Sequence, residues 1–95
     1  MELRERIGSG TLRMTIGVRE LIDGDANAMR DVAVLLNRHM NGDWGNVSDE
    51  DAEANDEAVV SGDRLLSSYT MRGREVWVLT ETGHDTTTVL LPSEY

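Results

Sequence analysis

Three polar side chains in the middle of this chain have types and spacing that suit hydrolytic chemistry. His39 and Asp43 are four residues apart, and Asn55 lies twelve residues further on. A histidine can move a proton near neutral pH, and a carboxylate or amide beside it can help to position the reacting groups. If these three side chains converge near the turn at residues 42–45, the chain is a small hydrolase or nuclease-like enzyme.

A simpler interpretation assigns no catalytic residue. Asp43 lies beyond the expected end of the helix that carries His39, and a metal site needs three or more protein ligands. His39 is then a cation at a helix C-terminus. With no cysteine in the chain, thiolate metal sites and cysteine nucleophiles are excluded. We therefore expect no metal, no cofactor and no catalytic activity.

Acidic side chains dominate residues 41–63, which contain no lysine or arginine, in a chain of formal net charge −9. The eight carboxylates are those of Asp43, Asp49, Glu50, Asp51, Glu53, Asp56, Glu57 and Asp63. Such a surface repels nucleic acid and anionic lipid, and it attracts basic protein surfaces over about a Debye length. We expect a basic protein partner and no direct contact with nucleic acid or membrane.

Part of this acidic segment has a regular spacing. Asp49, Glu53 and Glu57 recur every four residues, which places them about 6 Å apart along a helix. Such a row resembles the phosphates of a nucleic acid and could occupy a protein that grips nucleic acid with arginine and lysine. The alternative is a solvated face that keeps the chain in solution. The predicted partner-binding residues are Asp43, Trp44, Asp49, Glu50, Glu53, Asp56 and Glu57.

Trp44 stands in a glycine-flanked turn, between Gly42 and Gly45. A large ring in such a turn either plugs the edge of the core or is presented to a partner as an anchor. Both interpretations remain open from the sequence.

Hydrophobic periodicity predicts the elements that position these residues. Residues 11–20 alternate between apolar and polar side chains, which is typical of a strand. Apolar residues then recur at helical spacing across 26–40, at Met29, Val32, Ala33, Leu36 and Met40. A second helix is expected over about 49–60, with Ser48 as its N-cap and Gly62 as its end.

Three strands are expected after the helices, at residues 64–71, 75–81 and 86–91, joined by two short hairpin turns. The predicted fold is α+β, a single domain over 1–95 with two helices packed on a small, mostly antiparallel sheet, in the order β-α-α-β-β-β. A third interpretation is a homodimerising accessory domain that pairs through an exposed edge at residues 86–91. Because the first ten residues are polar and no apolar run approaches a membrane span, we expect a cytoplasmic protein.

From about residue 36 onward, a set of short motifs resembles a family of small proteins of plasmids, prophages and conjugative elements. These proteins are sometimes labelled type I restriction subunit M. The matching residues are Arg38-His39, Gly42-Asp43-Trp44-Gly45, Asn55-Asp56, Arg64-Leu65-Leu66-Ser67-Ser68-Tyr69, Trp77, Thr80-Glu81, Thr87-Thr88-Val89-Leu90-Leu91-Pro92 and Glu94-Tyr95. The segment Gly83-His84-Asp85 departs from the charged turn of the family.

The resemblance implies a mobile-element context, in which small acidic proteins often neutralise host defences. A DNA amino-methyltransferase needs a glycine-rich cofactor fold and an Asn-Pro-Pro-aromatic loop that holds a flipped base. A methylase role is excluded because this chain, with 95 residues and one proline, is too short for that fold and has no such loop. The leading hypothesis is a non-enzymatic inhibitor, either anti-CRISPR or anti-restriction, that presents its carboxylates to a basic nucleic-acid-binding site.

Overall fold

Four strands form one sheet in the computed structural model, which describes residues 10–95. The strands are β1 (Thr11–Met14), β2 (Leu65–Met71), β3 (Arg74–Thr80) and β4 (Thr86–Leu90), and their order across the sheet is β1-β4-β3-β2. β2, β3 and β4 pair antiparallel through the two predicted hairpins, while β1 pairs parallel to β4. The mostly antiparallel sheet is confirmed.

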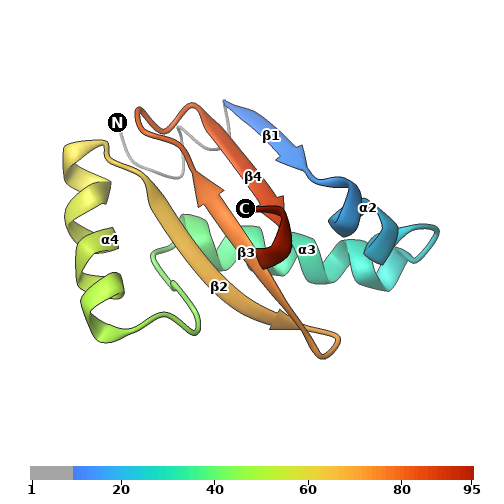
Figure 1. Cartoon of the computed structure of the whole chain (residues 1–95). Coiled ribbons are helices and arrows are strands. Elements are labelled where there is room, and N and C mark those ends of the chain that lie inside the picture. The colour runs from blue at the N-terminus through green and yellow to red at the C-terminus, as the bar shows by residue number, and fades with distance from the viewer. Residues whose placement is uncertain (1–9) are drawn as a thin grey trace.

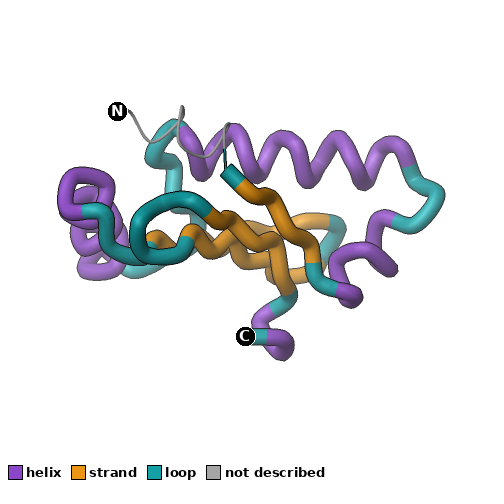
Figure 2. Tube along the Cα trace, turned by 90° about the horizontal axis from the view of Figure 1, so that it is seen from above, coloured by secondary structure: helices purple, strands orange, loops and turns teal. Residues whose placement is uncertain are grey.

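The helices are α2 (Ile16–Ile22), α3 (Ala26–Met40), α4 (Asp49–Ser61) and a short 3₁₀ turn, η1 (Pro92–Glu94). α3 covers one face of the sheet, and η1 lies on the opposite side (Figure 2). α4 stands beyond β2 at the side of the sheet (Figure 1). The α+β class is confirmed, but the element order is β-α-α-α-β-β-β, and the α-helices do not all share one face.

The predicted strand over residues 11–20 is wrong beyond Met14. Thr15 caps a helix there, since its hydroxyl accepts a hydrogen bond from the Val18 amide. Its hydroxyl also donates to Glu94, at 2.6 Å, and the other Glu94 oxygen accepts from the Gly17 amide, at 2.9 Å. A carboxylate from the far end of the chain therefore holds the start of α2, and no local pattern reports that contact.

The main core lies between α2, α3 and the sheet. Its α3 side chains are Ala28, Val32, Leu35 and His39. The predicted helix boundaries are confirmed, but the predicted stripe is offset, since Met29 is 58% exposed. A second, smaller core joins α4 to the sheet through Trp44, Ala58 and Leu65.

β4 lies inside the sheet, between β1 and β3. The prediction that residues 86–91 form an exposed edge is therefore wrong, and a homodimer cannot pair there without opening the sheet. Within residues 10–95, no helix is both long enough and apolar enough to span a bilayer.

Candidate functional site

Helix α4 carries most of the predicted contact residues, and local sequence signals define both of its ends. Ser48 accepts a hydrogen bond from the Asp51 amide at 3.1 Å, as the predicted N-cap. Asp49, Glu50 and Asp51 fill the first turn, where the helix dipole favours carboxylates. Gly62 ends the helix in the left-handed conformation, at φ 85°.

Asn55 fastens α4 to the edge of the sheet. Its amide nitrogen donates to the Leu66 carbonyl at 2.9 Å, and its amide oxygen accepts from the Leu66 N–H at 3.2 Å. One side chain thus satisfies both outward-facing backbone groups of a residue in the edge strand β2. The helix is held in a fixed orientation relative to β2.

With Asn55 and Ala58 buried, the opposite side of α4 faces solvent. Successive residues turn by about 100° around a helix, so Asp49, Glu53, Glu57 and Glu50 fall within about 100° of one another, centred opposite the buried side. All four are exposed. We call these four residues the α4 acidic face.

The α4 acidic face has no cationic partner within residues 10–95. The ion pairs of this part of the chain join Arg38 to Asp43, and Arg72 to both Asp25 and Asp31. Arginines of the described part of the chain therefore leave the α4 acidic face unneutralised.

Asp43 does not belong to that face. Arg38 binds it through two hydrogen bonds, from Nε at 2.7 Å and Nη2 at 3.2 Å. The Arg38 hydrogen bond lowers the pKa of the Asp43 carboxyl, and burial opposes this. The same guanidinium lies 4.7 Å from the centre of the Tyr69 ring. Asp43 is thus exposed but paired within the chain, so its charge is partly neutralised by Arg38.

Trp44 is a core residue with 5% of its surface exposed. Its indole N–H donates to Asp56 at 2.9 Å, and its ring meets the His39 ring edge-on, with centroids 5.6 Å apart. The core-plug interpretation is confirmed, and the ring is not presented as an anchor. Asp56 is exposed but is committed in part to holding Trp44.

His39 is fully buried, which sequence reasoning missed. Its Nδ1 lies 2.6 Å from Ser67 Oγ, and its Nε2 lies 2.8 Å from Thr80 Oγ1. Burial is the main cause that lowers the pKa of His39 to about 4, with a smaller contribution from nearby His84. The predicted helix-end cation is therefore a neutral core residue. The available signal was its place four residues after Leu35, in line with the buried face of α3.

The enzyme interpretation required His39, Asp43 and Asn55 to act together. The structure instead commits them to Ser67 and Thr80, to Arg38, and to the Leu66 backbone, respectively. Within the described residues, no three histidine or acidic side chains gather to hold a metal ion. Each of the three side chains therefore has a hydrogen-bond partner outside the set in the fold.

Comparison with family models, with curated proteins and with solved structures finds no match to this chain.

Proposed function

We propose that this chain is a non-enzymatic inhibitor that belongs to a mobile genetic element. It blocks a nucleic-acid-binding host defence complex of the CRISPR or restriction type. The observation that carries the proposal is the α4 acidic face, exposed, held rigidly on the sheet and unneutralised by residues 10–95. The resemblance of residues 36–95 to small proteins of mobile elements supports the mobile-element setting.

The arrangement of the α4 acidic face argues against a role in solubility alone. Asp49, Glu53 and Glu57 are like charges at successive i, i+4 positions, and each such pair destabilises a helix by about 0.2–0.5 kcal/mol. A surface that needed only solubility would gain it from carboxylates placed apart from one another, without the repulsion within the row. The row therefore carries a cost in stability that a bound cationic partner would offset.

A defined row of carboxylates suits a channel that binds phosphates. The residues of the row rise about 6 Å per step along α4, and their charges attract arginine and lysine side chains before contact. Such complementarity speeds association and selects the partner more than it adds affinity. An inhibitor of this kind competes with nucleic acid, and its binding weakens as salt screens both surfaces.

Carbodiimide cross-linking in a host lysate tests the proposal. All nine basic residues of the chain are arginines, so carboxylates of α4 that couple to lysine amines must couple to another protein. We expect links from Glu53 or Glu57 to a nucleic-acid-binding protein, lost at about 0.5 M salt and displaced by added DNA or RNA.

A matched pair of charge variants controls the experiment. The variant Glu53→Gln/Glu57→Gln and the control Glu20→Gln/Asp23→Asn each remove two exposed charges, and the control charges lie at α2, distant in sequence from α4. Because Glu53 and Glu57 are themselves coupling groups, retention of the partner is compared by pull-down without carbodiimide. The first variant should lose the partner and the second should keep it. Equal capture of the partner by both variants contradicts the proposed function. So does a partner that neither added DNA nor added RNA displaces.

A further inference from the structure

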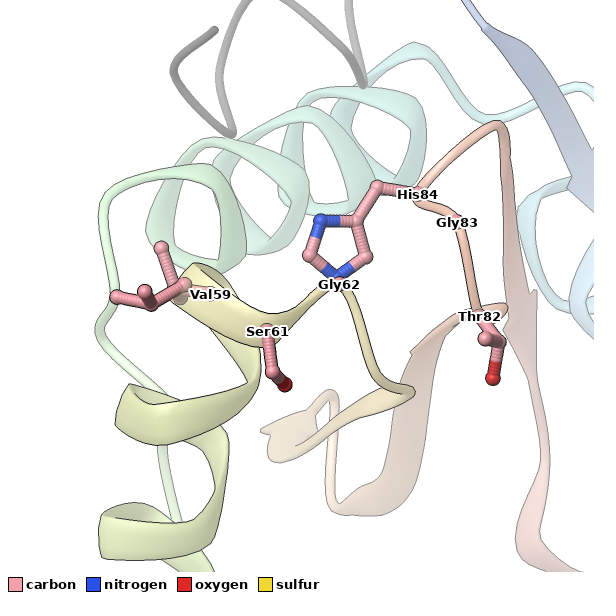
Figure 3. Close-up of a pocket in the computed structure, with 7 residues that line it drawn as sticks. Val59, Ser61, Gly62, Thr82, Gly83 and His84 are labelled. Carbon is pink, nitrogen blue, oxygen red and sulfur yellow. The ribbon is translucent and has the colours of Figure 1, made fainter.

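A pocket of about 460 Å³ opens where α4 ends. It is lined by Val59, Val60, Ser61, Gly62, Thr82, Gly83 and His84. Its walls come from the last turn of α4 and from the turn between β3 and β4, and the His84 ring extends from that turn toward the end of the helix (Figure 3). The pocket therefore adjoins the surface of α4. The sequence motifs did not indicate this pocket.

The His84 side chain offers this pocket a hydrogen-bond acceptor. The residue is 97% buried, and its Nε2 lies 2.8 Å from the Asp63 carbonyl oxygen. Because a carbonyl only accepts, Nε2 carries a proton, and in the corresponding neutral tautomer Nδ1 has a lone pair that can accept a hydrogen bond. Nδ1 has no hydrogen-bond partner in residues 10–95. A side-chain nitrogen there without a partner is not fully enclosed, and His84 lines the pocket.

The backbone of the pocket also supplies acceptors and withholds donors. The amides of Gly62, Gly83 and His84 donate within the chain, to Ala58, Gly62 and Glu81 respectively. The carbonyls of Val59, Val60 and Ser61 accept no hydrogen bond from residues 10–95, as expected for the last turn of a helix. With these three amides engaged and these three carbonyls open, the pocket favours a ligand that is rich in hydrogen-bond donors.

The charged residues that directly flank the lining segments in the sequence are all acidic. Asp63, Glu81 and Asp85 directly adjoin its lining residues and are exposed, and Asp85 Oδ2 would lie 3.9 Å from a Cβ on Gly83. The last turn of α4 has no basic residue, whereas α2 has Arg19 and α3 has Arg38 in theirs. The negative end of the α4 dipole is thus left without a cation from its own helix.

We propose that this pocket receives an arginine side chain of the partner protein. A guanidinium carries five donors and no acceptor, which matches several acceptors spread around one pocket better than a compact ammonium does. The aliphatic stem of that arginine packs along Val59 and Val60, of which Val60 is 90% exposed. This inference deepens the proposed function, since it names one residue type that the partner of the α4 acidic face must contribute.

Titration of the ¹⁵N-labelled protein with N-acetyl-arginine amide at about pH 8, where an ordinary histidine is neutral, tests the pocket directly. We expect saturable shifts of the Gly62, Thr82, Gly83 and His84 amides, with a Kd of about millimolar order for so small a ligand. N-acetyl-citrulline amide has the same shape without the charge and should give no saturable shift. N-acetyl-lysine amide should bind more weakly.

The variant Val60→Lys supplies the missing cation from within the chain, and Val60→Met is its matched neutral control. Lysine should weaken the binding of N-acetyl-arginine amide by about tenfold or more, and methionine should leave it within about twofold. Absence of shifts at the pocket, equal shifts with citrulline, or equal binding to Val60→Lys overturns the inference. Lysine amide binding as tightly as arginine amide overturns the choice of arginine.

The two proposals fail separately. The pocket titration uses no partner protein, whereas the Glu53→Gln/Glu57→Gln comparison leaves the pocket residues unchanged. If the double variant loses the partner and the pocket amides do not shift with N-acetyl-arginine amide, the proposed function stands and the arginine site is rejected. If the pocket amides shift and the double variant still binds the partner, the arginine site stands and the proposed function is rejected.

Discussion

At the scale of single residues, His39 is the side chain whose environment departs furthest from its usual one. It lies in the core with Ser67 and Thr80 on its two ring nitrogens, and Thr80 Oγ1 lies 2.8 Å from Thr87 Oγ1. This buried polar chain connects α3 with β2, β3 and β4. Because every member has a partner, it specifies one arrangement of helix and sheet.

The pKa of His39 makes stability depend on pH. Its pKa falls from the ordinary 6.5 to about 4 in the folded protein, mainly through burial. Between those two values the unfolded chain binds the proton and the folded chain does not, so stability falls as pH falls. The ring should therefore contribute a loss of about 3 kcal/mol between neutral pH and the folded pKa.

Urea unfolding of the wild type and of His39→Gln at several pH values checks this prediction. The variant lacks the titrating ring, so the stability advantage of the wild type over the variant should be largest at neutral pH and should shrink toward about pH 4. Comparing the two proteins cancels the titration of their shared carboxylates. An advantage that does not vary with pH contradicts the assignment.

The contact between Asp56 and Trp44 gives a second residue-scale prediction. Asp56→Ala leaves the indole N–H without its acceptor and should lower the free energy of unfolding by about 1–2 kcal/mol. Asp56→Asn keeps an oxygen at the same position and should recover most of the loss. Thermal unfolding of both variants measures the difference; equal destabilisation by alanine and asparagine shows that the hydrogen bond is not the cause.

At the scale of elements, the segment 44–46 and helix α4 protect the edge of the sheet. The Ser68 amide donates to the Trp44 carbonyl, and the Asn46 amide donates to the Ser68 carbonyl at 2.7 Å. Gly45, between them, has φ +74°, and a Cβ there would lie 2.1 Å from the Ser68 carbonyl oxygen. Asn55 serves the same edge at Leu66. The edge strand β2 is thus paired by a loop and by one side chain.

Gly45→Ala should therefore lower the free energy of unfolding by more than the backbone strain of a positive φ alone would. Gly73→Ala is the control, since Gly73 has φ +77° but no atom within 4 Å of its missing Cβ. We expect about 1 kcal/mol of destabilisation at Gly73 and more than about 3 kcal/mol at Gly45. Chemical denaturation measures both values, and equal losses mean that the close approach to Ser68 is not a constraint.

The like-charge row of α4 predicts that its central residue destabilises the free protein. Glu53 has Asp49 and Glu57 four residues away on either side, so Glu53→Gln should raise the free energy of unfolding by a total of about 0.4–1 kcal/mol at low salt. The gain should decrease as salt rises. Glu20→Gln, on α2, is the comparison. A loss of stability on removing Glu53 contradicts the electrostatic account of α4.

Local patterns predicted the elements whose ends and faces are locally encoded. The Ser48 cap, Gly62 and the hairpin turns place α4 and the three later strands within one or two residues of their observed bounds. α2 was missed because its start depends on Glu94, 77 to 79 residues away. In the candidate site, the exposure of Glu53 and Glu57 followed from helical periodicity. The roles of Asp43 and Trp44 depended on Arg38 and Asp56, whose positions only the folded chain brings together.

At the scale of the whole molecule, the carboxylates and the arginines that pair with them are unevenly distributed. The arginines at 38 and 72 pair with carboxylates near α3, while no ion pair within residues 10–95 involves a carboxylate of the α4 acidic face. That face is therefore an exposed, unpaired negative surface on a helix that Asn55 fastens to the sheet. It is the surface on which a basic partner is expected to bind.

The affinity of the cross-linked partner for the two charge variants, measured across about 50 to 300 mM salt, tests this claim most directly. The account predicts that Glu53→Gln/Glu57→Gln binds at least about tenfold more weakly than wild type and with a shallower dependence on salt. Glu20→Gln/Asp23→Asn, with the same net charge, should stay within about twofold of wild type. Equal affinities and equal salt dependence for the two variants would contradict the α4 acidic face as the contact surface.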